Sequence, residues 1–259
     1  MTRRDSAPMG APCWVELWTS EVESSRRFYA ELFGWVAEEP SPEHGGYFMF
    51  TRDGVPVAGA IGDIGDLHAD DTWKPYLASG DIGQTLRLAA DHGAKVLGPA
   101  MPVGDLGVQA VITDRQGLVI GVWQPGTFPG FTVINEDGAP RFFAFDTEDY
   151  HGAVDFYRKV FGWDPLEETT DDGHHYAGYM DPETGRPLAG IGDEVENLAP
   201  GAAPAWSVFW QSDDLDAAVA RVLALGGSVL NAPRDGGLGR VAHVADPAGA
   251  PFLLCEPKH

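Results

Sequence analysis

The chain has 259 residues, which is enough for one large domain or two ordinary ones. Apolar residues make up 44% of the chain and aromatic residues 11%, so it can bury a sizeable core, and a disordered or collagen-like chain is excluded. The formal net charge of −22 opposes binding to phosphate backbones and to anionic lipid surfaces. We therefore expect neither nucleic acid nor a membrane as a partner.

Cysteine usage and the first residues indicate the compartment. The two cysteines, Cys13 and Cys255, are too few for a disulfide scaffold, which favours free thiols in a reducing environment. The opening residues lack the apolar run of a signal peptide, and the longest apolar stretches are only as long as a strand. These features predict a soluble cytoplasmic protein.

The first half of the chain predicts a strand at 13–19 and then a helix that ends at Gly34, with apolar residues three and four positions apart. A hairpin of two short strands follows at 47–51 and 55–61. A second round then predicts a strand at 73–79, a helix at 82–92 and three further strands. The last hairpin turns at 114–117.

The second half repeats this series. Phe-Tyr-Ala-Glu-Leu-Phe-Gly-Trp at 28–35 recurs as Phe-Tyr-Arg-Lys-Val-Phe-Gly-Trp at 156–163, and the offset between matching positions stays between 128 and 133 along the chain. The predicted strands and helices of the second half lie at 142–146, 175–180, 187–191, 206–212 and 215–225, with a closing turn at 246–249. A repeat of this kind predicts two homologous modules, 8–126 and 139–259, joined by a linker at 127–138.

Each module reads as strand–helix–strand–strand–strand written twice. Two such βαβββ units can form a curved eight-stranded sheet around a cleft, with the helices packed outside. The predicted fold is therefore α+β, with two tandem modules of this type.

The repeated helix motif and the closing Asp-Pro-Ala-Gly turn at 246–249 resemble the vicinal oxygen chelate superfamily. This superfamily includes glyoxalase I, the bleomycin-resistance proteins and the extradiol dioxygenases. The resemblance covers both modules and is strongest to two-module actinobacterial glyoxalase-like proteins that are often labelled hydroxylases. It implies a divalent metal in the cleft, where the metal acts as a Lewis acid on two neighbouring oxygens of a substrate.

The family's ligand positions are occupied by residues that are poorly suited to hold that metal. They fall on three positions in each half, namely Trp14, Lys74 and Gly121, and Phe142, Ser207 and Leu253. Among these six only Ser207 is a competent ligand, and a poor one, so we expect no cofactor. A metal bound elsewhere stays an alternative, because His44, His92, His174, His175 and His243 are present.

Strand alternation predicts which side chains line the clefts. We expect the substrate-binding residues Trp14, Trp18, Tyr47, Met49, Trp73, Tyr76, Gln109, Trp123, Phe142, Phe209 and Gln211. The same alternation places Ala144, Asp146, Ser207, Leu253 and Cys255 on the cleft face of the second half. Aromatic residues at alternate positions also occur in filled cores, so this pattern is compatible with a closed cleft as well as an open one.

Glu16 is the candidate catalytic residue, because a carboxylate on an apolar cleft strand would have a raised pKa and could act as a general base. The alternative is that it faces solvent or pairs with Arg26, Arg27 or Lys74. Two functions follow. The first is a metal-free protein that binds a small planar or carbonyl-containing molecule between aromatic walls. The alternative is an enzyme of small-molecule metabolism: a glyoxalase-like lyase or isomerase, dependent on metal or on Glu16, or an oxygenase or hydroxylase. The repeat predicts a monomer or a weak homodimer.

Overall fold

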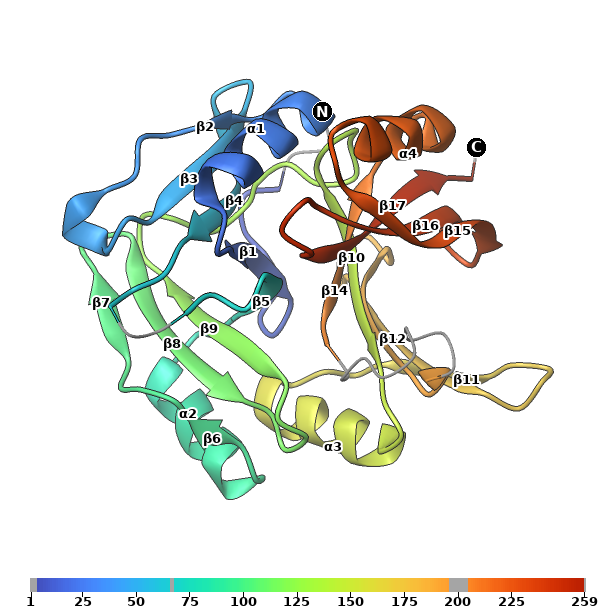
Figure 1. Cartoon of the computed structure of the whole chain (residues 1–259). Coiled ribbons are helices and arrows are strands. Elements are labelled where there is room, and N and C mark those ends of the chain that lie inside the picture. Colours follow the sequence, from blue (N-terminus) through green and yellow to red (C-terminus); the bar gives the residue numbers. More distant parts are fainter. Residues whose placement is uncertain (1–3, 66–67, 196–204, 259) are drawn as a thin grey trace.

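A computed structural model of the chain describes residues 4–65, 68–195 and 205–258. It is an α+β protein built on two mixed sheets, one from each half of the chain (Figure 1). Among the described helices, none is long and apolar enough to cross a membrane.

The first sheet has nine strands in the order β2-β3-β4-β1-β5-β9-β8-β6, and β7 pairs with β8 outside this path. Its strands are β1 (Pro12–Trp18), β2 (Val36–Ala37), β3 (Phe48–Arg52), β4 (Val55–Ile61), β5 (Thr72–Ala78), β6 (Lys95–Val96), β7 (Met101–Val103), β8 (Gly107–Thr113) and β9 (Val119–Pro125). The prediction of eight strands is short by one, because the segment before β8 forms two short strands.

The second sheet has the predicted eight strands, in the equivalent order β11-β12-β13-β10-β14-β17-β16-β15. Its strands are β10 (Pro140–Asp146), β11 (Leu166–Thr169), β12 (His175–Met180), β13 (Pro187–Gly192), β14 (Ser207–Gln211), β15 (Ser228–Gly236), β16 (Gly239–Ala245) and β17 (Pro251–Pro257). The helices are α1 (Val22–Phe33), α2 (Ile82–Asp91), α3 (Tyr150–Phe161) and α4 (Leu215–Ala224), with a short 3-10 turn at Pro42–His44. The repeat is therefore confirmed in the order and pairing of its strands.

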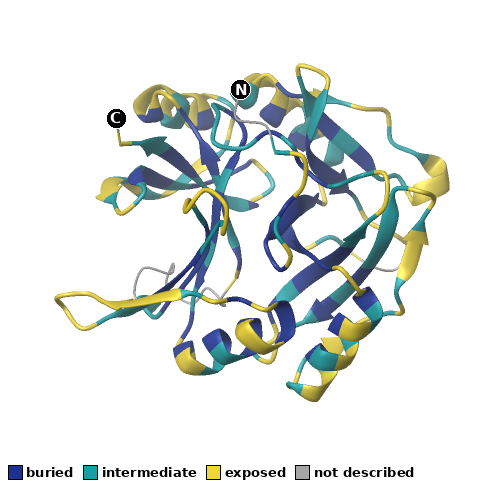
Figure 2. Cartoon of the chain, turned by 180° about the vertical axis from the view of Figure 1, so that it is seen from behind, coloured by how far each residue is buried: buried dark blue, intermediate teal, exposed yellow. Residues whose placement is uncertain are grey.

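The helix end predicted at Gly34 agrees with the structure, and the matching helix of the second module ends in the same way. Gly34 and Gly162 adopt the left-handed conformation that ends α1 and α3, and the Asp149 carboxylate caps the first turn of α3. Figure 2 shows that buried residues concentrate in the strands, whereas exposed residues follow the outer faces of the helices and the loops.

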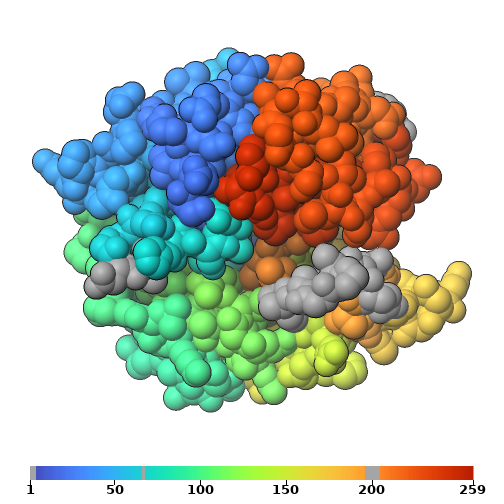
Figure 3. All heavy atoms as spheres, in the orientation of Figure 1, coloured from blue at the N-terminus to red at the C-terminus, as the bar shows by residue number. Residues whose placement is uncertain are grey.

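The four helices lie along the seam between the modules. In Figure 1, α1 of the first module lies beside α4 of the second, and α2 lies beside α3. Arg221 on α4 donates to a carboxylate oxygen of Glu31 on α1 at 2.9 Å. Figure 3 shows the blue N-terminal and red C-terminal parts of the chain in contact across the upper part of this face.

The repeated Phe-Tyr motif forms a reciprocal contact between the modules. The Tyr29 hydroxyl on α1 donates to Asp246 in the last turn of the second module at 3.1 Å, and it accepts from Trp73 Nε1 at 3.2 Å. The equivalent Tyr157 on α3 donates at 3.3 Å to Asp114, in the last turn of the first module. The helix of each module is thus anchored to a turn of the other.

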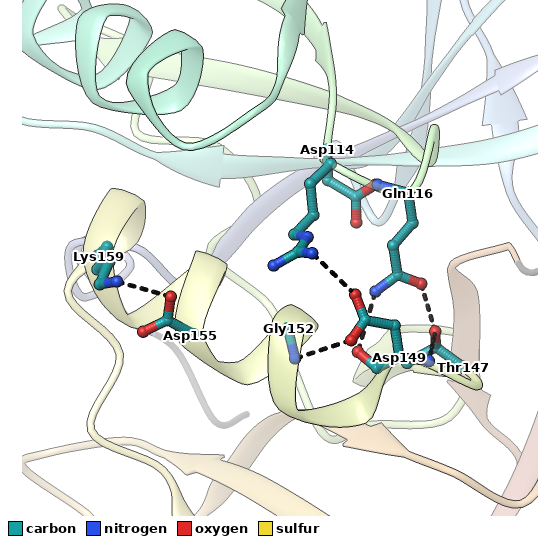
Figure 4. Close-up of polar contacts among 8 residues, drawn as sticks. Asp114, Gln116, Thr147, Asp149, Gly152, Asp155 and Lys159 are labelled. Carbon is teal, nitrogen blue, oxygen red and sulfur yellow. Dashed lines mark hydrogen bonds and ion pairs between the residues drawn. The ribbon is translucent and has the colours of Figure 1, made fainter.

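Two further contacts complete this seam. Trp35 Nε1 donates to the Gly138 carbonyl, and the equivalent Trp163 Nε1 donates to the Gly10 carbonyl, so both tryptophans of the repeat bind backbone of the other half or of the linker. Figure 4 shows that Gln116, in the turn before β9, reaches Thr147 and the start of α3. The tyrosines and tryptophans of the repeated motif therefore also make contacts that join the two modules.

Candidate functional site: the two concave faces

Strand pairing identifies the side chains that share the concave face of the first sheet. Trp14 pairs with Tyr76, and Glu16 pairs with Lys74 on one side and with Gly59 on the other. Since directly paired residues point to the same face of a sheet, these side chains project together. By the same rule Tyr47, Met49, Gln109 and Trp123 lie on this face, with Trp18 two residues along β1 from Glu16.

Trp73 is the predicted cleft residue that the sheet places elsewhere. It pairs with Leu17 and therefore points to the opposite face. There its ring packs against Tyr29 and Trp210 at centroid distances of 5.3 and 5.2 Å. Trp73 lies three residues from Tyr76 on the same strand, and an odd spacing places two residues of a strand on opposite faces.

The concave face of the first module is filled by its own side chains. The Tyr76 hydroxyl donates to Glu16 Oε2 at 2.7 Å, and Trp14 Nε1 donates to the Tyr47 hydroxyl at 2.9 Å. Two glycines give these rings room, because a Cβ on Gly59 or on Gly121 would lie about 2 Å from the Tyr47 or the Tyr76 ring system. The aromatic side chains thus lie flat on the sheet and bond to one another.

Glu16, the predicted catalytic base, lies within this network. Burial raises its pKa, while hydrogen bonds from Tyr76 and Tyr47 and the charge of Lys74 act in the opposite direction. The Lys74 ammonium lies 4.7 Å from the centre of the Trp18 ring and also pairs with Asp70. The carboxylate is therefore buried and bonded to neighbouring side chains.

The linker between the modules covers part of the same face. The Phe128 ring meets Trp14 edge-to-face at 4.9 Å, and the Phe128 carbonyl accepts a hydrogen bond from Trp123 Nε1 at 2.9 Å. A segment expected only to connect the modules thus packs against the first cleft.

The second module contains a pocket of about 100 Å³ on its concave face. Phe209, Val241 and Leu253 contribute apolar walls, with the small Ala144 and Ser207 between them. The polar side chains that line it are those of Asp146, Ser207, Asn231, Arg234 and His243. An apolar pocket with a few convergent polar groups is the usual form of a small-molecule site.

A comparison of matching positions explains why the two modules differ. Glu16 and Lys74 of the first module correspond to Ala144 and Ser207 of the second, which pair in the same way between the first two central strands. These smaller side chains leave unfilled the volume that the first module fills.

The register across the second sheet places the polar residues of the pocket. Phe209 pairs with Leu253, Leu253 with His243, and His243 with Asn231, so the four form one row across the concave face. Arg234 lies three residues after Asn231, which in a regular strand would point it to the other face. A break in the register between them restores it to the pocket face, opposite Val241.

Burial and nearby charges shift the pKa values of Asp146 and His243 in the pocket. Burial and the nearby Glu194 carboxylate raise the pKa of Asp146 to about 6, against the opposing charge of Arg234. Burial and the same guanidinium lower the pKa of His243. At neutral pH the imidazole is therefore uncharged, and Arg234 is the cation of the pocket lining.

The predicted residues of the second module lie on its concave face. Phe209 lines the pocket, and Phe142 meets its ring edge-to-face at 5.4 Å. Gln211 is buried and bonded to Arg141 and Asp213. Sequence reasoning missed the polar residues of β15, since alternation alone cannot locate a bulge.

The resemblance to the vicinal oxygen chelate superfamily implies a divalent metal, but the donor set here does not fit one. The position of a ligand in the first module holds the cationic Lys74, and the pocket of the second contains a guanidinium beside its one carboxylate and one imidazole. Within residues 4–65, 68–195 and 205–258, no group of three or more His, Cys, Asp or Glu side chains is arranged to hold a metal ion. A cation would also be repelled by the lysine and the arginine.

Comparison with known proteins identifies the family. The Glyoxalase/Bleomycin resistance protein/Dioxygenase superfamily matches residues 142–254. A Mycobacterium bovis protein named "Putative glyoxylase CFP32" is 32% identical, with 99% of this chain and 98% of the relative covered. DnrV of Streptomyces peucetius, named an anthracycline biosynthesis protein, is 33% identical, with 95% of this chain and 93% of DnrV covered. The chain belongs to the glyoxalase/bleomycin resistance/dioxygenase superfamily.

Solved structures show the same fold. The Mn(II)-bound glyoxalase from Novosphingobium aromaticivorans superposes with a TM-score of 0.65 at 14% identity, covering 100% of this chain and 84% of that one. The 2,2',3-trihydroxybiphenyl 1,2-dioxygenase from Sphingomonas wittichii gives a TM-score of 0.64 at 14% identity, covering 95% and 90%. At this identity the likeness concerns the fold alone.

Proposed function

We propose that the second module binds a small planar, carbonyl-containing molecule without a metal, and that the first module serves as its scaffold. The observation that carries this proposal is the pocket on the second concave face, where the first module has side chains that fill the equivalent space. Phe209 offers a ring face or edge to a flat ligand, and Ser207 and Arg234 offer donors to a carbonyl oxygen.

The size of the pocket limits what enters it. Its volume of about 100 Å³ is smaller than the cavity of about 150 Å³ that holds benzene in an engineered protein, so one oxygen-bearing edge of a ring would enter while the rest stays outside. The name of DnrV connects that relative to anthracyclines, which are planar polycyclic carbonyl compounds. This supports a flat ligand that inserts one end.

The alternative of an enzyme based on Glu16 has weaker support. Its carboxylate is buried and accepts hydrogen bonds from Tyr76 and Tyr47, so a substrate would have to displace packed side chains to reach it. The second module offers Asp146 in an open pocket instead.

Calorimetric titration with 7-methoxycoumarin, a planar carbonyl compound without an ionisable group, tests the proposal. Ser207→Lys introduces the residue found at the equivalent position of the first module, and we expect it to weaken binding about tenfold or more, which corresponds to 1.4 kcal/mol. Ser228→Lys, at an exposed position on β15, is the matched control and should bind as the unaltered chain does. Binding that survives Ser207→Lys, or that is lost with EDTA and restored by Mn²⁺ or Zn²⁺, would refute the proposal.

A further inference from the structure

We propose that Arg234 supplies, in the pocket of the second module, the positive charge that a metal supplies elsewhere in this fold, and that with Asp146 it selects ligands bearing an acidic hydroxyl. The ligand class is then a phenol or an enol, bound with its oxygen as the anion. This inference rests on the proposed function, because it concerns the ligand of the same pocket.

The backbone of β15 is built to direct Arg234 into the pocket. Asn231 pairs with His243 and Arg234 pairs with Val241, so three residues on β15 span two on β16. The extra residue lies in the segment that contains Pro233, which has no N–H to offer a neighbouring strand. β15 is the edge strand of its sheet, where a proline and a bulge are tolerated. Both side chains therefore line the same pocket.

The backbone opposite Asp146 leaves room for its carboxylate in the pocket lining. Asp146 is the last residue of β10 and pairs with Gly192. A Cβ on that glycine would lie 2.2 Å from the Asp146 carboxylate, so only a glycine leaves room for it. Besides Arg234, which lowers the pKa of Asp146, the Glu194 and Asp193 carboxylates raise it, and Asp146 in turn raises the pKa of Tyr176.

Asp146 accepts the proton of a bound hydroxyl group, and Arg234 stabilises the anion that remains. The O–H bond of the ligand breaks, its proton forms an O–H bond with the Asp146 carboxylate, and the electron pair stays on the ligand oxygen beside Arg234. No oxidant or reductant is required. A pKa of about 6 makes Asp146 a better proton acceptor than an ordinary carboxylate of its type.

The charges in the pocket favour an anionic ligand over a cationic one. The chain as a whole carries a formal charge of −22, yet this pocket contains an arginine whose charge reaches both Asp146 and His243. After the proton has moved, Asp146 is neutral, so the ligand anion is left with one nearby cation. The interaction is a charge-assisted hydrogen bond, which is stronger than one between neutral groups.

7-Hydroxycoumarin tests the inference, because its phenol and phenolate absorb at different wavelengths. We expect the bound probe to ionise at a pH lower by about one unit or more, a tenfold change in its ionisation equilibrium. Arg234→Met should abolish this shift, and Arg234→Lys, which keeps the charge, should retain part of it. Arg240→Met is the matched control, because Arg240 lies on β16 and pairs with Asp216 and Glu256 instead.

The pH dependence of the affinity for 7-hydroxycoumarin provides a second readout. Above the pH at which the free probe ionises, the complex of the unaltered chain must regain one proton, so its affinity should fall tenfold per pH unit. Asp146→Asn cannot take up that proton, and its affinity should lose this slope.

The outcomes separate the two proposals. If 7-methoxycoumarin binds as tightly as 7-hydroxycoumarin and the ionisation of the latter does not shift, the inference on ligand class is overturned while the pocket remains a binding site. An unchanged shift in Arg234→Met also overturns it. If neither coumarin binds, the proposed function and the inference fail together.

Discussion

Tyr29→Phe removes one hydroxyl from the seam between the modules and is expected to destabilise the whole chain. The hydroxyl donates to Asp246 and accepts from Trp73, and the Tyr29 side chain is fully buried. A hydrogen bond to a charged group contributes about 1.5–3 kcal/mol and a neutral one about 0.5–1.5 kcal/mol, so the loss of both should cost about 3 kcal/mol. For a chain of this size that corresponds to a fall in Tm of about 6–12 °C.

Urea unfolding monitored by tryptophan fluorescence measures this loss, with Tyr150→Phe as the control. The Tyr150 hydroxyl reaches Glu167 at 3.5 Å, the outer limit of a hydrogen bond, so its removal should cost less than about 1 kcal/mol. Equal effects of the two substitutions would refute the reasoning, as would a Tyr29→Phe transition in which one module unfolds separately from the other. The equivalent Tyr157→Phe should reproduce the Tyr29→Phe result, because its hydroxyl has the same two kinds of partner.

Three further predictions concern packing, pH and thiol chemistry. Gly121→Ala should lower the free energy of unfolding by about 1–3 kcal/mol, because its Cβ would lie 2.1 Å from the Tyr76 ring, whereas Gly98→Ala, with open space around it, should be neutral in the same urea assay. The folded-state pKa of Asp146 is raised to about 6, so its contribution to stability is fully present below about pH 4 and is lost as pH rises through 6. The loss amounts to about 3 kcal/mol at most. Unfolding curves taken from pH 4 to 7 should show this loss in the unaltered chain but not in Asp146→Asn. A slope of the opposite sign would contradict the assigned shift. Both cysteine thiols are buried, with pKa values raised by burial, so Ellman's reagent at pH 8 should react slowly until urea unfolds the chain, and rapid reaction of the folded chain would contradict that burial.

The fold could be predicted from sequence because the same pattern occurs twice. Matching positions at a nearly constant offset define the module, and the glycines that end α1 and α3 mark its first helix. Alternation also places Trp14, Glu16 and Trp18 on one face of β1, and the strand pairing agrees. The repeat and the alternation are both patterns in the order of residues along the chain, so they can be recognised without knowing which residues meet in space.

The open cleft could not be predicted in this way. Whether a concave face is filled depends on the volumes of side chains that meet across several strands, such as Glu16 and Tyr76 in one module and Ala144 and Phe209 in the other. The role of Arg234 depends on a one-residue bulge, and no alternation rule signals where a bulge occurs. The seam was also missed, because the repeated Phe-Tyr motif satisfies helix periodicity whether or not it contacts another module.

The reciprocal bonds of Tyr29 and Tyr157 give the chain the symmetry of a two-fold dimer, although its two halves are covalently joined. In a dimer of identical subunits, every substitution occurs at two sites at once, so a lysine that blocks one cleft blocks both. In a fused chain, Lys74 and Ser207 can be inherited independently at equivalent positions. One module can then fill its concave face with side chains while the other keeps a pocket for a ligand, which two identical subunits cannot do.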